Sequence, residues 1–407
     1  MTQVLISIIL AFSLMMILSR WRLWLGVLAA GVIFGLINYD THSFFRLTYE
    51  TFSTPENWFL VIGVGLIPVL GAIMRESVHL TEILNRLKRK KKLYLMMTPL
   101  LFGLLPIPGG ALLSSPLLKD FDKNISHEHT TVINLWFRHL LIIVYPLSPS
   151  LIIAAQLAGL TIVQAVLAMI PVMLVMFVTG YFFLLRKIKE NSEDQPVITK
   201  NLGKRKTIQT LLIFLAAPIL HIVLSTTVLK EYERLSFLLA MLGSVIIAMI
   251  SNRISIKGLL PIIKKSKFEQ FSLLFLFLLL FLAMLAGYED LNLLFQGFSP
   301  PLYFVGVMAF LLTFISGRIE ISLSIVYPFI FSVYELTTFS SILFAFIYFS
   351  LFAGYLISPL HPCMAFSIEY FQTSYKKVVS ILLPLLLIPF LAISIIFWLS
   401  GILNNLP

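Results

Sequence analysis

Three ionisable side chains stand inside apolar stretches of the sequence, where charge is rare. Arg318 and Glu320 interrupt the apolar stretch 300–334, and His361 stands between two prolines in the stretch 340–371. Ionisable groups within a membrane are costly and are usually functional. A guanidinium can hold a carboxylate through two parallel hydrogen bonds, whereas a carboxyl group or an imidazole can carry a proton. The three residues therefore indicate anion binding coupled to an ion.

Each of these residues also has a structural interpretation, which stays open. Arg318 and Glu320 would form an ion pair with each other or bond a nearby carbonyl, and His361 would be a satisfied core histidine. Glu369, two helical turns beyond His361, is either a coupling carboxylate or a residue at the cytoplasmic end of its helix. The predicted coupling set is Glu320, His361 and Glu369.

Small or hydroxyl-bearing residues lie at the other predicted interruptions of apolar segments. Their hydroxyl groups either cap a broken helix or contact a substrate, and both interpretations hold together. With Arg318 and His361, the predicted substrate-binding residues are Pro108, Gly109, Gly110, Ser114, Ser148, Ser150, Ser316, Gly317 and Ser358.

Sequence signatures of enzymes are absent from the chain. It contains no GxxxxGK(S/T), HExxH or GxSxG motif and no cluster of Cys and His in the sequence. The single cysteine, Cys363, excludes a disulfide scaffold. We therefore expect no enzymatic activity, no metal site and no cofactor apart from a coupling Na⁺ or H⁺.

The composition indicates a membrane protein that crosses the bilayer several times. The 407 residues are 59% hydrophobic and 12% charged, with a net charge of +11. Soluble domains carry about 25% charged residues. The basic residues stand in short runs between apolar segments, which is typical of topology signals and excludes a nucleic-acid-binding domain.

Ten apolar segments are long enough to cross a bilayer, which takes about 20 residues in a helix. They are 2–19, 23–38, 57–75, 133–157, 161–185, 208–229, 235–251, 269–287, 340–371 and 377–403. Phenylalanine, with 35 residues, is concentrated in 271–281 and 344–352, and we interpret it as lipid-facing bulk. Arg138 and His139 begin a span, and we expect their side chains to reach the interface.

Two further apolar stretches, 93–118 and 300–334, contain helix breakers near their centres. Five basic clusters hold 22 of the 30 Lys and Arg residues: Arg20 with Arg22, residues 86–92, residues 186–206, residues 253–267, and Lys376 with Lys377. All five fall on one face if each stretch enters and leaves on the same side. The positive-inside rule therefore predicts two re-entrant hairpins, basic loops in the cytoplasm and both termini outside.

An internal repeat divides the chain. Residues 146–171 match 359–384 at a constant offset of 213, with three prolines in register. We therefore predict an all-α polytopic fold of two inverted repeats, residues 1–190 and 208–407, joined by a cytoplasmic linker at 191–207. Each repeat has five spans and one hairpin. The helices at about 133–157 and 340–371 are predicted to be broken at the midplane, which is the layout of secondary transporters.

Two short motifs resemble the ion transporter superfamily, which includes gluconate, citrate and divalent-anion symporters. They are Leu70-Gly71-Ala72-Ile73-Met74-Arg75-Glu76-Ser77 and Leu105-Pro106-Ile107-Pro108-Gly109-Gly110-Ala111-Leu112. Within that superfamily the whole chain most resembles a branch of prokaryotic proteins of unknown function. The resemblance implies a scaffold domain that dimerises, a transport domain with hairpins and broken helices, and elevator-type uptake of small organic anions with Na⁺ or H⁺.

The hairpin tips depart from that pattern. Sodium-coupled members often carry Ser-Asn-Thr triplets there, whereas these tips read Pro-Gly-Gly and Ser-Gly-Arg. The titratable residues Glu320, His361 and Glu369 favour protons as the coupling ion. The leading hypothesis is an ion-coupled carboxylate transporter, a homodimer in the inner membrane of a prokaryote. The alternatives are a proton/cation antiporter, a lipid or prenyl-phosphate translocase, and a scaffold or intramembrane enzyme, against which the repeat argues.

Overall fold

The computed structural model describes residues 2–18, 21–75, 84, 87–88, 90–104, 111–119, 121, 124–189, 204–229, 231–286, 288 and 300–400. Within these residues the chain is helical and has no strand, which confirms the predicted all-α class. Six of the described helices are long and apolar enough to cross a membrane, or seven if one bent pair forms a single span. The protein is therefore an all-α polytopic membrane protein.

The described elements follow one another along the chain with these bounds: α1 (Thr2–Leu18), α2 (Leu23–Asn38), α3 (Thr41–Ser53), α4 (Pro55–Arg75), α6 (Lys91–Gly103), α7 (Ala111–Leu118), α8 (His127–Leu140), the 3-10 turn η1 (Ile142–Val144), α9 (Pro149–Leu157), α10 (Ile162–Gly180), the π-helical turn η2 (Tyr181–Leu185), α11 (Lys204–Thr226), α12 (Glu233–Ser251), α13 (Ile256–Ser266), α14 (Phe268–Ala286), α16 (Leu302–Ser316), α17 (Ile319–Tyr334), α18 (Ser341–Ile357), α19 (Pro362–Phe371) and α20 (Tyr375–Leu399).

The same series of elements occurs in both halves of the chain. Each half has two apolar helices, a short helix, a long helix, a helix pair, an interrupted helix and a long closing helix. The short helices, α3 and α13, begin with side-chain caps from Asp40 and Ser255 and were not expected from the sequence. The opposite orientation of the two halves in the membrane stays a prediction.

The chain forms two compact units, and each takes segments from both halves. Unit 1 comprises Met1–Met74, Leu215–Pro300 and Ser324–Leu336. Unit 2 comprises Arg75–Phe214, Pro301–Leu323 and Thr337–Pro407. Unit 1 therefore gathers most of the early helices of both halves and the larger part of α17. Unit 2 gathers the pair α6–α7, helix α16 with the start of α17, and the interrupted helices. The compact units do not coincide with the predicted repeats.

In unit 1, helix α2 packs against α1 on one side and α14 on another. The close approach of α2 and α14 depends on Gly31, since a Cβ there would lie 3.3 Å from the Cα of Phe281. Arg234 on α12 donates to the side chain of Asn57 on α4 over 2.7 Å. Close packing at small residues and a few interhelical hydrogen bonds thus join these helices. This is common in membranes, where the hydrophobic effect does not drive helices together.

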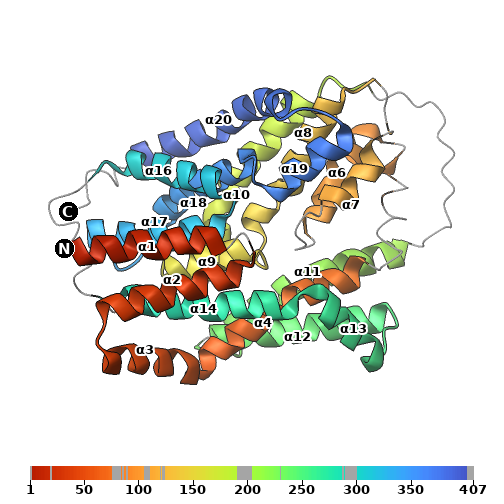
Figure 1. Cartoon of the computed structure of the whole chain (residues 1–407). Helices are drawn as coiled ribbons and strands as arrows, with labels where there is room; N and C mark the ends of the chain where they lie inside the picture. The colour runs from red at the N-terminus through yellow and green to blue at the C-terminus, as the bar shows by residue number, and fades with distance from the viewer. Residues whose placement is uncertain are drawn as a thin grey trace. The chain divides into compact units, whose positions relative to one another are not determined.

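Helix α18 forms the centre of unit 2 and packs against α10, α16 and α20 (Figure 1). The side chains of Phe344, Phe346, Phe349 and Phe352 are completely buried in it. The expectation that these phenylalanines face lipid is therefore wrong. They lie on several sides of one helix that is surrounded by protein, so their bulk fills the core of the unit.

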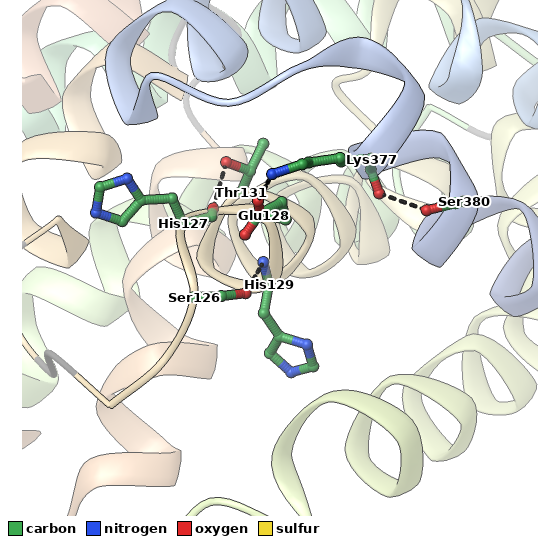
Figure 2. A network of polar contacts seen from close by, with 7 residues as sticks. All are labelled: Ser126, His127, Glu128, His129, Thr131, Lys377 and Ser380. Carbon is green, nitrogen blue, oxygen red and sulfur yellow. Dashed lines mark hydrogen bonds and ion pairs between the residues drawn. The ribbon is translucent and has the colours of Figure 1, made fainter.

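One end of unit 2 collects three of the predicted basic clusters. Lys92 donates to the carbonyl of Arg186 over 3.1 Å, and His129 bonds the carbonyl of Leu184 over 2.9 Å. Close to His129, Glu128 on α8 and Lys377 on α20 form an ion pair of 2.8 Å (Figure 2). An exposed ion pair of this kind contributes about 0–1 kcal/mol to the free energy of folding. Its significance here is that it shows the start of α8 and the start of α20 to lie side by side.

These contacts show where the helix pair α6–α7 enters and leaves unit 2. The start of α6 and the start of α8 both contact residues at the end of α10 and η2. The chain between them therefore goes in and comes back at one end. The two ends of the pair α16–α17 also meet, since the hydroxyl of Tyr334, the last residue of α17, donates to the carbonyl of Pro300 just before α16. With 15 residues, α16 rises about 22 Å and is shorter than the roughly 30 Å hydrocarbon layer.

Candidate functional site

The two interrupted helices of unit 2 have the same local backbone. Ser148 N–H bonds the carbonyl of Tyr145 over 2.8 Å, and His361 N–H bonds that of Ser358 over 3.1 Å. These residues are related by the sequence offset of 213. Both resumed helices, α9 and α19, start with a proline in the first turn, which suits its missing N–H. The repeat in the sequence is thus a repeat of backbone geometry.

The turn between α16 and α17 lies against the second interruption. Gly317 has a left-handed φ of 66°, and a Cβ there would lie 2.7 Å from the Cβ of Leu360. The hydroxyl of Ser358 donates to the carbonyl of Phe314 over 2.7 Å. At the turn itself, Ser316 Oγ accepts from the N–H of Arg318 over 3.3 Å. The hydroxyls of Ser316 and Ser358 therefore shape the two chain reversals.

Arg318 and Glu320 flank the start of α17, and both are half-buried. Among the residues that the structure describes, no ion pair within 4 Å joins their side chains, although the charge of Arg318 acts on the carboxyl group of Glu320. Both lie within electrostatic range of the phenol of Tyr355 on α18. The guanidinium of Arg318 thus stands beside the second helix interruption without a carboxylate bonded to it.

His361 lies in a buried cluster with two residues that the sequence analysis did not assign to a site. The ligand atoms of His139, His361 and Cys363 are all within 4.8 Å of one another. His139 Nδ1 bonds the carbonyl of Leu135 over 2.7 Å, whereas neither ring nitrogen of His361 makes a hydrogen bond of normal geometry to the described residues. The cluster joins the end of α8 to the start of α19.

The interface position expected for Arg138 and His139 is wrong. Their exposed fractions are 2% and 1%, and Arg138 donates to the carbonyl of Phe102 on α6 over 2.7 Å. A backbone carbonyl takes up the charged side chain because α6 packs closely on α8 at Gly103, where a Cβ would be 2.1 Å from the Arg138 carbonyl oxygen. One feature of the sequence could have indicated their burial, because both residues stand only a few positions before a predicted helix break.

At the first interruption, hydroxyl groups form a short chain. Ser148 Oγ lies 3.1 Å from Ser150 Oγ, which in turn lies 3.2 Å from the hydroxyl of Tyr348 on α18. All three side chains are buried. Tyr348 was not singled out in the sequence, since its position within an apolar, aromatic run gives no signal.

Asn134 on α8 connects the hairpin arm α7 to α19. Ser114 donates to Asn134 Oδ1 over 2.6 Å, and Asn134 Nδ2 donates to Ser115 over 3.1 Å and to Ser367 over 3.3 Å. These four side chains are completely buried. Ser114, a predicted substrate contact, therefore bonds a neighbouring helix.

The remaining predicted residues fall into two groups. Pro108, Gly109 and Gly110 lie outside the described residues. Glu369 is exposed near the end of α19. Unit 2 thus gathers Arg318, Glu320, His361 and the predicted serines from α7, α9, the α16–α17 turn and the α18–α19 interruption, while Glu369 stands apart on the outer end of its helix.

The fold of the chain has a counterpart among solved structures. The chain is similar to the crystal structure of the Alcanivorax borkumensis YdaH transporter, with a TM-score of 0.50 and 15% sequence identity, over 95% of this chain and 98% of that one. This likeness shows a shared fold. No curated protein matches the chain in sequence.

The sequence also matches a family along nearly its whole length. Residues 4–400 match the family described as "Protein of unknown function (DUF401)". This agrees with the expected branch of proteins of unknown function, while membership of the ion transporter superfamily stays a prediction. The chain belongs to the DUF401 family.

Proposed function

We propose that the protein is a secondary transporter that moves a small organic anion with an ion gradient, and that unit 2 binds the anion. One observation carries this proposal. Arg318 stands half-buried at a helix turn in an apolar unit, with no carboxylate bonded to it among the described residues. Such a cation is costly unless it has a counter-charge, so it favours an anionic ligand.

Neighbouring backbone supports the same ligand chemistry. Helix α17 starts at Ile319 and α19 starts at Pro362, and the first turn of a helix presents free N–H groups and partial positive charge. The α16–α17 turn packs on the residues that precede α19, so the two helix starts are near each other. A carboxylate would take two bonds from the planar guanidinium and further bonds from these N–H groups.

Glu320 is our candidate for the coupling group. It lies in the first turn of α17, two residues after Arg318 in the chain, and it is half-buried. The exposure of Glu369 supports Glu320 over that residue. A carboxylate in this place would exchange a proton or bind Na⁺, since among the described residues no ion pair holds it.

The layout of unit 2 supports transport in particular. Interrupted helices whose polar backbone lies within a bilayer are tolerated where they line a binding cavity, and secondary transporters use pairs of them. The shared fold with the YdaH transporter agrees with this role. The same proposal includes elevator-type alternating access with unit 2 carrying the ligand, a homodimer, and basic loops on the cytoplasmic side of a prokaryotic inner membrane.

Thermal stabilisation of the purified protein by a panel of carboxylates tests the proposal. A ligand at 100 times its Kd stabilises the native state by about 2.7 kcal/mol. We expect one carboxylate to raise the melting temperature of the wild type, at one of two pH values and with Na⁺ or choline. Arg318→Ala should lose that shift. Arg46→Ala, an exposed arginine on α3, is the matched control and should keep it.

The main competing hypothesis is a proton/cation antiporter. The Arg318→Ala variant distinguishes it from the anion transporter. A cation exchanger gains nothing from a fixed positive charge in its site, so a shift produced by a cation and kept in Arg318→Ala would favour it. The lipid translocase loses part of its support, since the phenylalanines of α18 are buried. A shift by a lipid phosphate alone would revive it.

A further inference from the structure

His139, His361 and Cys363 bring two imidazoles and a thiol to one point inside unit 2. Their ligand atoms all lie within 4.8 Å of one another, and the two imidazole rings meet edge to face with centroids 4.8 Å apart. The exposed fractions of the three side chains are 1%, 0% and 4%. Donor atoms from two helices in different halves of the chain thus converge in a water-excluded place.

The second feature of the cluster is the hydrogen bonding of the His361 ring. Both ring nitrogens are buried, and among the described residues neither makes a hydrogen bond of normal geometry, although the backbone carbonyl of Leu356 interacts with the ring. One face of the ring lies against Tyr355, with centroids 4.0 Å apart, so the phenol ring fixes the imidazole but bonds neither nitrogen. Buried polar atoms are nearly always satisfied, and those that are not call for an explanation such as a bound ion.

His139 is arranged as a metal ligand usually is. Its Nδ1 lies 2.7 Å from the carbonyl of Leu135, which fixes Nδ1 as the protonated nitrogen. Metal-binding histidines almost always donate their other N–H to such an acceptor. The ring of His139 also interacts with the Cys363 thiol, so the remaining lone pair on Nε2 and the sulfur atom would turn to the ion together.

We propose that His139, His361 and Cys363 bind one metal ion with a filled d shell, Zn²⁺ or Cu⁺. Thiolate and imidazole are the ligands that these ions prefer, whereas Na⁺, Mg²⁺ and Ca²⁺ require oxygen ligands. Bonds of about 2.0–2.1 Å to nitrogen and about 2.3 Å to sulfur place the ligand atoms roughly 3.3–3.8 Å apart. The side chains therefore close by about 1 Å on binding.

The ion would join the end of α8 to the start of α19. Those are the two points at which the interrupted helices of unit 2 come together, so the metal would hold the interruptions in a fixed relation. This role goes beyond the proposed anion transport. In it, His361 and Cys363 bind a resident metal ion, whereas Arg318 binds the transported anion.

Metal content is the direct test. The full-length protein is purified in detergent, stripped with a chelator, loaded with Zn²⁺ or, under reducing conditions, with Cu⁺, and desalted. Mass spectrometry of the elements should find one ion per chain with one of the two metals. Loading with Co²⁺ should produce the near-ultraviolet charge-transfer band of a cobalt–thiolate bond, which reports on Cys363 in the unmutated protein.

Variants then identify the ligands. Cys363→Ser and His361→Gln should weaken binding by more than the roughly 10–100-fold that loss of an outer-shell partner costs. His127→Gln, exposed on the same helix α8, and His221→Gln, buried in unit 1 and bonded to Ser236, should bind as the wild type does. Elution volume and melting without metal check that each variant folds.

The proposal is wrong if folded wild-type protein retains neither metal and shows no cobalt–thiolate band. It is equally wrong if Cys363→Ser retains the full amount of metal. Neither result bears on the anion proposal, because no carboxylate is present in these measurements and the Arg318 variant is not used.

Discussion

At the scale of single residues, the α16–α17 turn depends on a glycine. Gly317 adopts a left-handed conformation, φ 66°, and its Cα faces Leu360 at a distance that leaves no room for a Cβ. The glycine therefore serves two purposes at once. It lets the chain reverse after α16, and it lets the reversal sit against the α18–α19 interruption, which is how Arg318 reaches that place.

Gly317→Ala should destabilise the protein. The left-handed backbone and the clash with Leu360 together should cost about 1–3 kcal/mol, measured as a lower melting temperature in detergent. Gly243→Ala is the control, because that glycine is inside α12 and meets only the end of the Leu220 side chain. Helix propensity favours alanine there by up to about 1 kcal/mol. Equal melting of Gly317→Ala and wild type would contradict the argument.

The sequence predicted part of the site and missed part of it, for physical reasons. Arg318, Glu320 and His361 stand out because charge is rare in apolar runs. His139 and Cys363 do not, since His139 lies close to a basic span end and a thiol counts as apolar. Their meeting depends on two interruptions packing together, and no spacing along the chain records it.

At the scale of elements, the interrupted helices repeat one design. Three backbone hydrogen bonds of the first interruption recur in the second at an offset of 213: those from Tyr145, Ser148 and Ile152 correspond to those from Ser358, His361 and Ala365. The prolines predict these interruptions because each fixes its own φ and removes a donor. The amphipathic helices α3 and α13 were missed, because a search for long apolar segments passes over them.

Asn134 is the residue that holds three of these elements together. Removing its side chain would leave buried hydroxyl groups on α7 and α19 without the amide. Asn134→Ala should therefore lower stability by about 1–3 kcal/mol. Asn252→Ala, half-exposed at the end of α12, should change the melting temperature little and serves as the control. Unchanged melting of Asn134→Ala would show that the network contributes nothing.

At the scale of the whole molecule, charge and packing agree on one end of unit 2. The positive-inside rule assigned Lys92, Arg186 and Lys377 to one face, and the contacts around η2 and the starts of α6, α8 and α20 bring these regions together within the unit. The sequence did not predict how the chain divides into two units, because that depends on contacts between segments from different halves.

Topology can be checked with single cysteines, since Cys363 is buried and the wild type serves as the blank. We expect Lys92→Cys and Lys377→Cys to react with a membrane-impermeant maleimide from the same side of the membrane. Arg46→Cys, on α3, should react from the opposite side. Labelling of Lys92→Cys and Lys377→Cys from different sides would contradict the predicted hairpin.

The central claim is that unit 2 binds a small organic anion at Arg318 and carries it across the membrane. Uptake of a labelled carboxylate into liposomes that contain the purified protein tests this most directly, under an imposed H⁺ or Na⁺ gradient. We predict that the wild type concentrates the anion only while the gradient lasts, and that folded Arg318→Ala does not. Wild-type uptake equal to that of empty liposomes for every carboxylate, or unimpaired uptake by Arg318→Ala, would contradict the claim.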